Sequence, residues 1–290
     1  MKYLFIIQGE GRGHMTQTIS LFNILVSNGH EVCQIIVGKS ARRKIPSFFY
    51  NQLKGCDILT IESPNFVTDT NNKSIKIGAT VISNFKKIST FRKSLQTIDE
   101  KVKEKNPDVI VNFYDFLGGI FVKLYKPKCH FVCIAHQYLA LHHDFPFAKG
   151  KLWDKVSLKL GNALTSLNAD RILALSFSDK YKSNNRVVVT PPLLRKEVSE
   201  LSTSNKGFIL IYMVNDGYAE EVFKFHKQNP EIPLHCFWDR ENAAETETLD
   251  DTLTFHQISD HKFLSMMSDC MAYASTAGFE SICELSLIHI

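Results

Sequence analysis

The sequence lacks several features that would assign it to a specialised class of protein. Its seven cysteines follow no regular framework, and Cys33, Cys133 and Cys236 lie in apolar stretches, as reduced thiols of a cytoplasmic protein do. The apolar run at residues 3–7 is too short for a secretory signal, and no run is long enough to span a bilayer. The formal net charge is only +4, which does not favour a nucleic acid as partner. We therefore expect a cytoplasmic globular protein.

Arrangements typical of a metal site are also missing. Cys129, His130, Cys133 and His136 are close in sequence, but they fall along one expected strand, whose alternation turns them to different faces. No Asp-x-Asp triplet is present to hold a divalent cation beside a diphosphate. The sequence therefore predicts no metal site.

Apolar strands and amphipathic helices alternate along the chain, which is typical of parallel sheets covered by helices. The strands expected first are 3–7, 32–37, 108–112, 130–135, 169–175 and 187–189. A second series is expected at 208–212, 234–238, 253–256 and 272–275. A proline- and serine-rich linker at 191–206 separates the two series. The sequence thus predicts two α/β domains, residues 1–195 and 196–290.

A glycine-rich loop, Gly-Glu-Gly-Arg-Gly-His at residues 9–14, follows the first strand. The glycines allow a close approach of the backbone, and the helix that follows offers free N–H groups and the positive end of its dipole to an anion. A dinucleotide fingerprint would need a third glycine and an acidic residue ending the second strand, which ends here in Val37-Gly38-Lys39. This argues against a nicotinamide-dependent oxidoreductase. A tight turn carrying a surface histidine is the alternative interpretation.

The far end of the chain holds a second strand–turn–helix unit, at residues 271–284. Small residues and a glycine at the end of the strand, with a carboxylate about two helical turns further on, suit a nucleotide. Three segments then carry a resemblance, namely the loop at 9–14, VVTPPLLR at 188–195 and AGFESICE at 277–284. They resemble GT-B glycosyltransferases, close to the family 28 group that includes the peptidoglycan N-acetylglucosaminyltransferase.

This resemblance implies a GT-B fold, in which two Rossmann-like domains with parallel sheets face a cleft. It implies inverting transfer of a hexosyl or N-acetylhexosaminyl group from a uridine-diphosphate-linked sugar to a lipid or small-molecule acceptor. It implies no cofactor and no metal. Family members continue past the glutamate that matches Glu284, so the last residues, 285–290, indicate a truncated second domain. A genuinely short homologue is the alternative.

On the acceptor side, the resemblance makes His14 the catalytic base. The residues expected around the acceptor and the phosphates are Gly11, Arg12, Gly13, Thr16, His136 and Gln137. Asp115 either faces the same crevice or caps a helix, and His142 and His143, beside Asp144, are expected to be exposed.

On the donor side, Gly278 and Ser281 are expected at the phosphates, Glu284 at the ribose and Glu280 at the sugar. Thr276 stands where related plant enzymes carry a histidine, and its hydroxyl adds no charge. Arg195 resembles an arginine that contacts the donor near the hinge, with a solvated linker arginine as the alternative.

Two other functions stay open. A non-hydrolysing sugar-nucleotide epimerase would share the fold and the donor glutamate, and a catalytically inactive binding module would keep the glycine loop for packing alone. Family 28 members often use lipid acceptors at the inner face of the membrane, and two basic clusters would suit a peripheral contact there. These clusters are Lys39, Arg42, Arg43 and Lys44, and Lys86, Lys87, Arg92 and Lys93 on a long helix expected from Phe85 to a stop at Asn106-Pro107. Solvated helix faces are the alternative.

Overall fold

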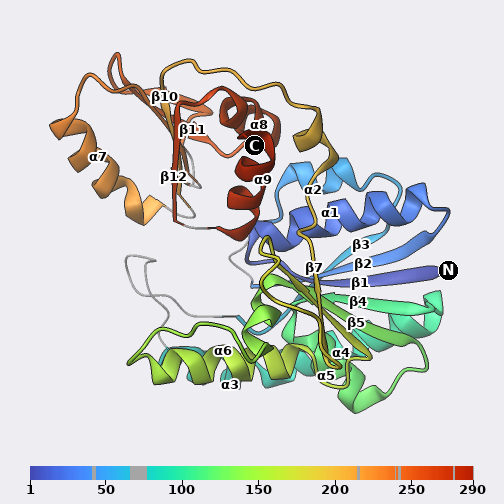
Figure 1. Cartoon of the computed structure of the whole chain (residues 1–290). Coiled ribbons are helices and arrows are strands. Elements are labelled where there is room, and N and C mark those ends of the chain that lie inside the picture. The colour runs from blue at the N-terminus through green and yellow to red at the C-terminus, as the bar shows by residue number, and fades with distance from the viewer. Residues whose placement is uncertain are drawn as a thin grey trace. The chain divides into compact units, whose positions relative to one another are not determined.

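The computed structural model of the chain describes residues 1–40, 44–65, 77–213, 216–238, 240, 243–276 and 278–289. The chain divides into two compact units, drawn in Figure 1. The first holds Met1–Asn65 and Gly78–Arg195, and the second is built on Lys196–Ile290.

The first unit is built on a seven-stranded sheet whose strands are all parallel. In spatial order the strands are β3 (Ile58–Glu62), β2 (Glu31–Lys39), β1 (Lys2–Gln8), β4 (Val109–Phe113), β5 (His130–Ala135), β6 (Arg171–Leu175) and β7 (Val187–Thr190). The order reverses at β1, which lies between β2 and β4. Open α/β sheets bind ligands beyond the carboxyl ends of the strands at such a switch point.

Helices cover both faces of this sheet (Figure 1). They are α1 (Arg12–Ser27), α2 (Ser47–Gln52), α3 (Ile77–Lys86), α4 (Ile88–Lys105), α5 (Phe116–Tyr125), the 3-10 helix η1 (His136–Leu141) and α6 (Leu152–Thr165). The core between sheet and helices includes Leu4, Ile6, Ile110, Phe121 and Phe131, all nearly inaccessible to solvent. This apolar packing fixes the strand ends from which the site is built.

The long helix expected from Phe85 is two helices, α3 and α4, separated by a turn at Lys87. Phe91, Leu95 and Ile98 of α4 are buried, as the apolar spacing predicts, whereas Phe85 belongs to α3 and is exposed. The expectation for Phe85 is therefore wrong, because the turn takes it out of the register of the buried face. Helix α4 ends at Asn106, whose left-handed backbone (φ 46°) closes the last turn.

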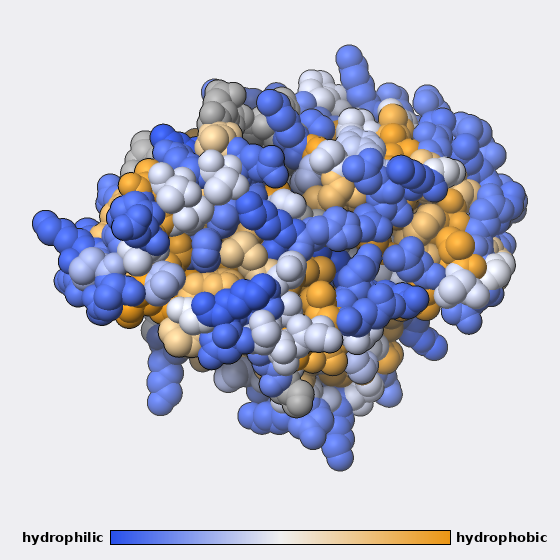
Figure 2. Space-filling model, turned by 90° about the horizontal axis from the view of Figure 1, so that it is seen from above, coloured by the Kyte–Doolittle hydropathy of each residue, from blue (hydrophilic) through white to orange (hydrophobic). Residues whose placement is uncertain are grey.

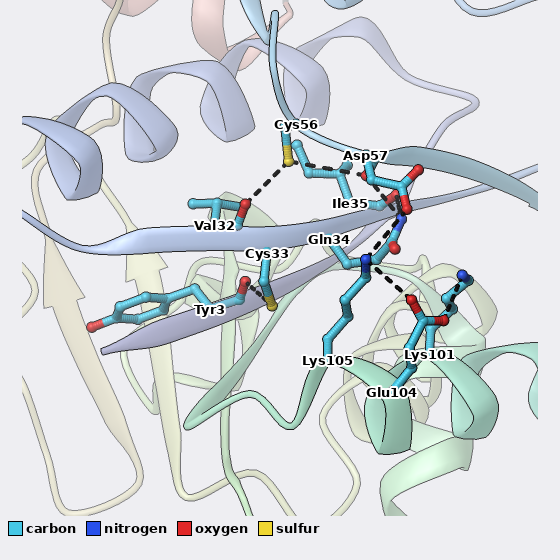
Figure 3. Close-up of polar contacts among 10 residues, drawn as sticks. All are labelled: Tyr3, Val32, Cys33, Gln34, Ile35, Cys56, Asp57, Lys101, Glu104 and Lys105. Carbon is cyan, nitrogen blue, oxygen red and sulfur yellow. Dashed lines mark hydrogen bonds and ion pairs between the residues drawn. The ribbon is translucent and has the colours of Figure 1, made fainter.

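Polar contacts connect the segments near the amino ends of β1 and β2 (Figure 3). The Cys33 thiol donates to the Tyr3 carbonyl at 3.2 Å and the Cys56 thiol to the Val32 carbonyl at 3.3 Å. Burial raises the pKa of both thiols, that of Cys56 to about 11, so they stay protonated and unreactive. All seven cysteines are free, as the sequence predicts.

The second unit has a mixed five-stranded sheet. Its spatial order is β10 (Thr246–Thr248), β11 (Leu253–Gln257), β9 (Leu234–Trp238), β8 (Ile209–Tyr212) and β12 (Ala272–Ser275). Its helices are η2 (Lys196–Glu200), η3 (Asp216–Tyr218), α7 (Ala219–Gln228), α8 (Asp260–Asp269) and α9 (Phe279–His289). Strand β10 runs antiparallel to β11, so the expectation of a purely parallel second sheet is wrong at this edge. Among the described residues, the strand order of this sheet reverses at β8, which lies between β9 and β12. Helix α9 follows β12 along the chain.

Hydrophilic side chains predominate on the face drawn in Figure 2, and apolar ones appear between them in small groups. Of the helices in the described part of the chain, none is both long and apolar enough to cross a membrane. In the two basic clusters, Lys87 forms an ion pair with Glu62, and Arg42 and Arg43 lie outside the described residues.

Candidate functional site

The glycine loop joins the carboxyl end of β1 to α1 at the switch point of the first sheet. The Gly9 amide donates to the Gly38 carbonyl at 2.7 Å, and a Cβ at Gly9 would lie 2.6 Å from Val37 Cγ1, so only glycine allows this approach. Gly11 is the N-cap of α1, and no side chain caps the helix there; the Gly11 amide itself donates to Gln8 Oε1 at 3.3 Å. The strand, loop and helix are arranged as the sequence predicts, and the role of the loop as an anion site stays a prediction.

Arg12 and Gly13 open α1, and the Thr16 hydroxyl donates to the Gly13 carbonyl at 2.8 Å. This bond uses the only proton of the hydroxyl and leaves its oxygen able to accept from a ligand. Gln17 is fully buried one residue further along the helix.

His14 is buried, with 6% of its surface exposed, so the alternative of a surface histidine is wrong. Its ring lies nearly parallel to that of Tyr114, with centroids 5.7 Å apart, and to that of His136, with centroids 6.4 Å apart. The Gln137 amide nitrogen lies 3.4 Å from His14 Nε2. The structure thus brings His14 together with His136 and Gln137, which lie more than a hundred residues further along the chain.

Burial holds both imidazoles in the neutral form. It lowers the pKa of His14 from 6.5 to about 4, and a hydrogen bond that the ring donates to the Gln17 side chain opposes the shift. The pKa of His136 falls to about 3, chiefly through burial and then through repulsion from His14 when that ring is protonated in acid. At neutral pH each ring therefore keeps a lone pair that can accept a proton.

Tyr114 and Asn162 connect to the residues around His14 through hydrogen bonds. The Tyr114 hydroxyl donates to Asn162 Oδ1 at 2.7 Å, and Asn162 Nδ2 donates to the Gln137 carbonyl at 2.8 Å. Tyr114 has a left-handed backbone (φ 64°), a conformation that costs energy for a bulky residue and occurs mostly at functional turns. Sequence reasoning missed both residues, because only the fold brings α6 against the end of β4.

Asp115 caps helix α5, so the helix-cap interpretation of this residue is confirmed. Its Oδ1 accepts from the Leu117 amide at 2.8 Å and from the Ser63 hydroxyl at 2.9 Å. Its Oδ2 is buried with no hydrogen-bond partner among the described residues, and burial raises the pKa of the carboxyl to about 6. Gly38 makes room for it, since a Cβ there would lie 2.1 Å from Oδ2.

His142 is buried, whereas His143 and Asp144 are exposed. The expectation of an exposed His142 is therefore wrong. Its ring packs edge-on against Tyr181 and its Nε2 lies 2.9 Å from the Lys182 carbonyl, so a distant loop covers it.

In the second unit, the motif around residue 278 lies where β12 leads into α9. The Thr276 side chain is half-buried, and its hydroxyl has no hydrogen-bond partner within the described ranges. The Ser281 hydroxyl donates to the Gly278 carbonyl at 3.1 Å. Glu280 is half-buried in the first turn of α9, while Ser281 and Glu284 are buried one turn apart. Ala277 lies outside the described residues.

Arg195, the last residue of the first unit, is buried, with 7% of its surface exposed. The alternative of a solvated linker arginine is therefore wrong. The role of this residue stays a prediction.

Comparison with solved structures shows the fold alone, because the identities are low. UGT89C1 of Arabidopsis thaliana in complex with quercetin has a TM-score of 0.57 and 12% identity, over 98% of this chain and 76% of that chain. Phytolacca americana UGT2, complexed with UDP-2fluoro-glucose and pterostilbene, gives 0.60 and 11%, over 98% and 77%. The UDP-GlcNAc 2-epimerase of Neisseria meningitidis bound to UDP-GlcNAc gives 0.58 and 13%, over 96% and 78%.

These neighbours confirm the GT-B fold that the sequence predicts. A comparison with curated protein sequences finds no match. A family model described as "Glycosyl transferase family 1" matches residues 1–289. The match covers nearly the whole chain, and the closer resemblance to family 28 stays a prediction. The chain belongs to glycosyl transferase family 1.

Proposed function

We propose that this protein transfers a sugar from a nucleoside-diphosphate sugar, with a uridine diphosphate donor, to a lipid or small-molecule acceptor with inversion. The observation that carries the proposal is the buried, neutral imidazole of His14, which stands where a phosphate-binding type of loop meets α1. A base of this kind is what an attacking hydroxyl needs.

In the proposed step, the imidazole of His14 takes the proton of the acceptor hydroxyl. The acceptor oxygen forms a bond to the anomeric carbon from the face opposite the diphosphate, and the bond from that carbon to the diphosphate oxygen breaks. The nucleoside diphosphate leaves with the electron pair. Because a pKa of about 4 makes His14 a weak base, the step depends on stabilising the negative charge of the leaving group.

The donor site of the proposal is the start of α9. The helix N-terminus and the hydroxyls of Thr276 and Ser281 would hold the phosphates beside Gly278, while Glu284 would accept from the ribose hydroxyls and Glu280 from the sugar. Arg195 and Arg12 would add positive charge. Since these groups offer a dipole and hydrogen bonds to the diphosphate, we propose transfer without a metal ion or other cofactor.

The structural neighbours support a uridine diphosphate donor, because complexes with UDP, UDP-L-rhamnose and UDP-2fluoro-glucose are among them. The AGFESICE motif supports the same donor through its resemblance to family 28. Quercetin and pterostilbene in the neighbouring complexes support a small-molecule acceptor. The acceptor stays open between this class and a lipid.

Helix α6 supports the lipid alternative and a peripheral contact with the membrane. Leu152, Trp153, Val156 and Leu160 lie on one side of it and are exposed, Trp153 to 76%. Lys151, Lys155 and Lys159 flank this apolar side. A helix with tryptophan and leucine on one side and lysines beside it binds the interface of an anionic bilayer, and each lysine contributes about 1 kcal/mol.

Vesicle flotation tests this contact. We expect binding to anionic vesicles at low salt, lost in the Trp153→Ser/Leu160→Ser variant and kept when the exposed Ile24 of α1 is changed to serine. Equal flotation of all three proteins would mean that α6 does not make the membrane contact. No flotation of the wild type at low salt would favour a small-molecule acceptor.

Binding of nucleoside diphosphates tests the proposed donor. We expect UDP to raise the melting temperature of the protein more than ADP or GDP does, and we expect Glu284→Gln to reduce that rise. The absence of stabilisation by any nucleoside diphosphate would refute the transferase proposal. If incubation of a UDP-sugar without acceptor gave an isomerised sugar, the epimerase alternative would replace it.

A further inference from the structure

The hydrogen bonds around His14 decide which nitrogen of its ring can act as the base. A neutral imidazole carries one proton, either on Nδ1 or on Nε2, and only the other nitrogen has a lone pair that can accept a second proton. His14 is neutral at pH 7, because burial lowers its pKa to about 4. The neighbours that donate to the ring or accept from it therefore set its tautomer.

Gln137, the second residue of η1, faces Nε2 of His14. Its amide nitrogen lies 3.4 Å from that atom. An amide nitrogen donates and cannot accept, so this contact is favourable only when Nε2 presents its lone pair. The single proton of the ring is then on Nδ1, and the ring donates it to the side chain of Gln17 on the same helix. Turning the Gln137 amide over would set two acceptors, its Oε1 and the Nε2 lone pair, against each other.

The backbone of Gln137 is fixed by Asn162 of α6, a fully buried residue. Asn162 Nδ2 donates to the Gln137 carbonyl at 2.8 Å, and Asn162 Oδ1 accepts from the Tyr114 hydroxyl at 2.7 Å. The Tyr114 ring in turn lies nearly parallel to that of His14, with 17° between their planes. A closed circuit of contacts thus runs from His14 through Gln137, Asn162 and Tyr114 back to His14. It holds the amide group and the imidazole in a fixed relation.

The titratable side chains packed against the His14 ring are those of Tyr114 and His136. Burial raises the pKa of Tyr114 and lowers that of His136 to about 3, so both are uncharged at neutral pH. By donating to the lone pair, Gln137 also favours the neutral ring, whereas a carboxylate in its place would favour the protonated one. The bond of 3.4 Å is longer than the usual length of about 2.9–3.0 Å, so an acceptor hydroxyl can replace the amide at Nε2.

We propose that Gln137 is a positioning residue, which holds His14 in the tautomer that has its lone pair on Nε2. The proposal rests on the proposed function, in which His14 takes the proton of the acceptor hydroxyl. When the acceptor binds, its hydroxyl takes the place of the amide at Nε2, and the lone pair accepts the proton there. Gln137 acts through His14 and does not itself contact the reacting atoms.

Nitrogen-15 NMR of the full chain, labelled at its histidines, reads the tautomer directly at pH 7 without any substrate. The signals of His14 are those missing from the spectrum of His14→Gln. We expect the wild type to carry the proton on Nδ1. In Gln137→Leu, which loses the amide, the form protonated on Nε2 should appear beside it. In Gln137→Glu the carboxylate accepts from Nε2, so that form should predominate, and the pKa of His14 should rise by about 1–3 units.

The matched control is Gln52→Leu, because Gln52 is a half-buried glutamine of the same unit, at the end of α2. Its spectrum should show the wild-type tautomer of His14. Melting temperatures of all variants establish that they are folded.

Acceptor-dependent release of UDP gives the second readout. Gln137→Leu should lower kcat roughly 2–10-fold, as expected for the loss of one hydrogen bond, with no rise in the KM for the acceptor. The proposal is overturned if His14 of the wild type carries its proton on Nε2 at pH 7, or if Gln137→Leu keeps the wild-type tautomer. Failure of the proposed function would look different, since UDP release would then be absent while the tautomer still depended on Gln137.

Discussion

Replacing His14 with glutamine should make the stability of the protein less sensitive to acid. The unfolded chain takes up a proton at this residue near pH 6.5, whereas the folded protein takes it up only near pH 4, because the ring is buried. Between these values the unfolded state binds more protons, so the free energy of unfolding falls as the pH drops. For one such residue the loss between pH 7 and pH 4 is about 3 kcal/mol.

Urea unfolding at pH 7, 5 and 4, followed by far-ultraviolet circular dichroism, measures this loss. The His14→Gln variant should lose about 3 kcal/mol less than the wild type between pH 7 and pH 4, with about two thirds of the difference present at pH 5. Comparing pH values within each protein cancels the packing that the substitution removes. The pKa of His136 is lowered as well, but His136 is present in both proteins, so its contribution cancels in the comparison.

His130→Gln is the control, because its ring is exposed. Equal pH dependence of the wild type and His14→Gln would mean that the folded protein protonates His14 as readily as the unfolded chain does. The neutral, buried base of the proposed mechanism would then be wrong.

Three further predictions concern the packing at Gly38, the donor site at Glu284 and the metal requirement of the transfer. Gly38→Ala should lower the free energy of unfolding by about 1–3 kcal/mol in urea denaturation, because its Cβ would lie 2.1 Å from Asp115 Oδ2 and 2.7 Å from Ser63 Cβ. Gly161→Ala in α6 should cost nothing, since its nearest contact would be 3.4 Å, and an equal loss in both variants would contradict this reasoning. Glu284→Gln should weaken UDP binding by about 1–3 kcal/mol in calorimetry, while His14→Gln should leave it nearly unchanged; the reverse pattern would exchange the two assigned roles. Sugar transfer should persist in a chelator well below the melting temperature, and activity lost with the chelator and restored by manganese would refute metal-independent transfer.

The sequence predicts the strands and helices around the candidate site well where local signals act alone. The glycine loop, the strand before it and the helix after it follow from residues 3–27, because the apolar run, the glycines and the helix start are all read from neighbouring residues. The end of α4 at Asn106 and the position of β12 and α9 were predictable for the same reason.

Burial by distant segments was not predictable. His142 is covered by residues 181–182, and Tyr114 is held by Asn162, so both depend on contacts across about 40 residues or more. Strand β10 consists of Thr246, Glu247 and Thr248, which carry no apolar signal, and it forms because the edge of β11 supplies hydrogen bonds. The apolar spacing assigned Phe85 to the buried face of one long helix. A single turn at Lys87 divides that helix in two and shifts the register, so the spacing did not hold.

Release of UDP from a UDP-sugar in the presence of acceptors tests the central claim most directly, with His14→Ala beside the wild type. Flavonols and lipid extracts serve as the two acceptor pools. The account predicts acceptor-dependent release by the wild type, a fall of roughly two to four orders of magnitude in kcat for His14→Ala, and no fall for His130→Ala. Donor binding by calorimetry should be the same in all three proteins. Near-normal turnover of a folded His14→Ala enzyme, or no acceptor-dependent release by the wild type, would contradict the account.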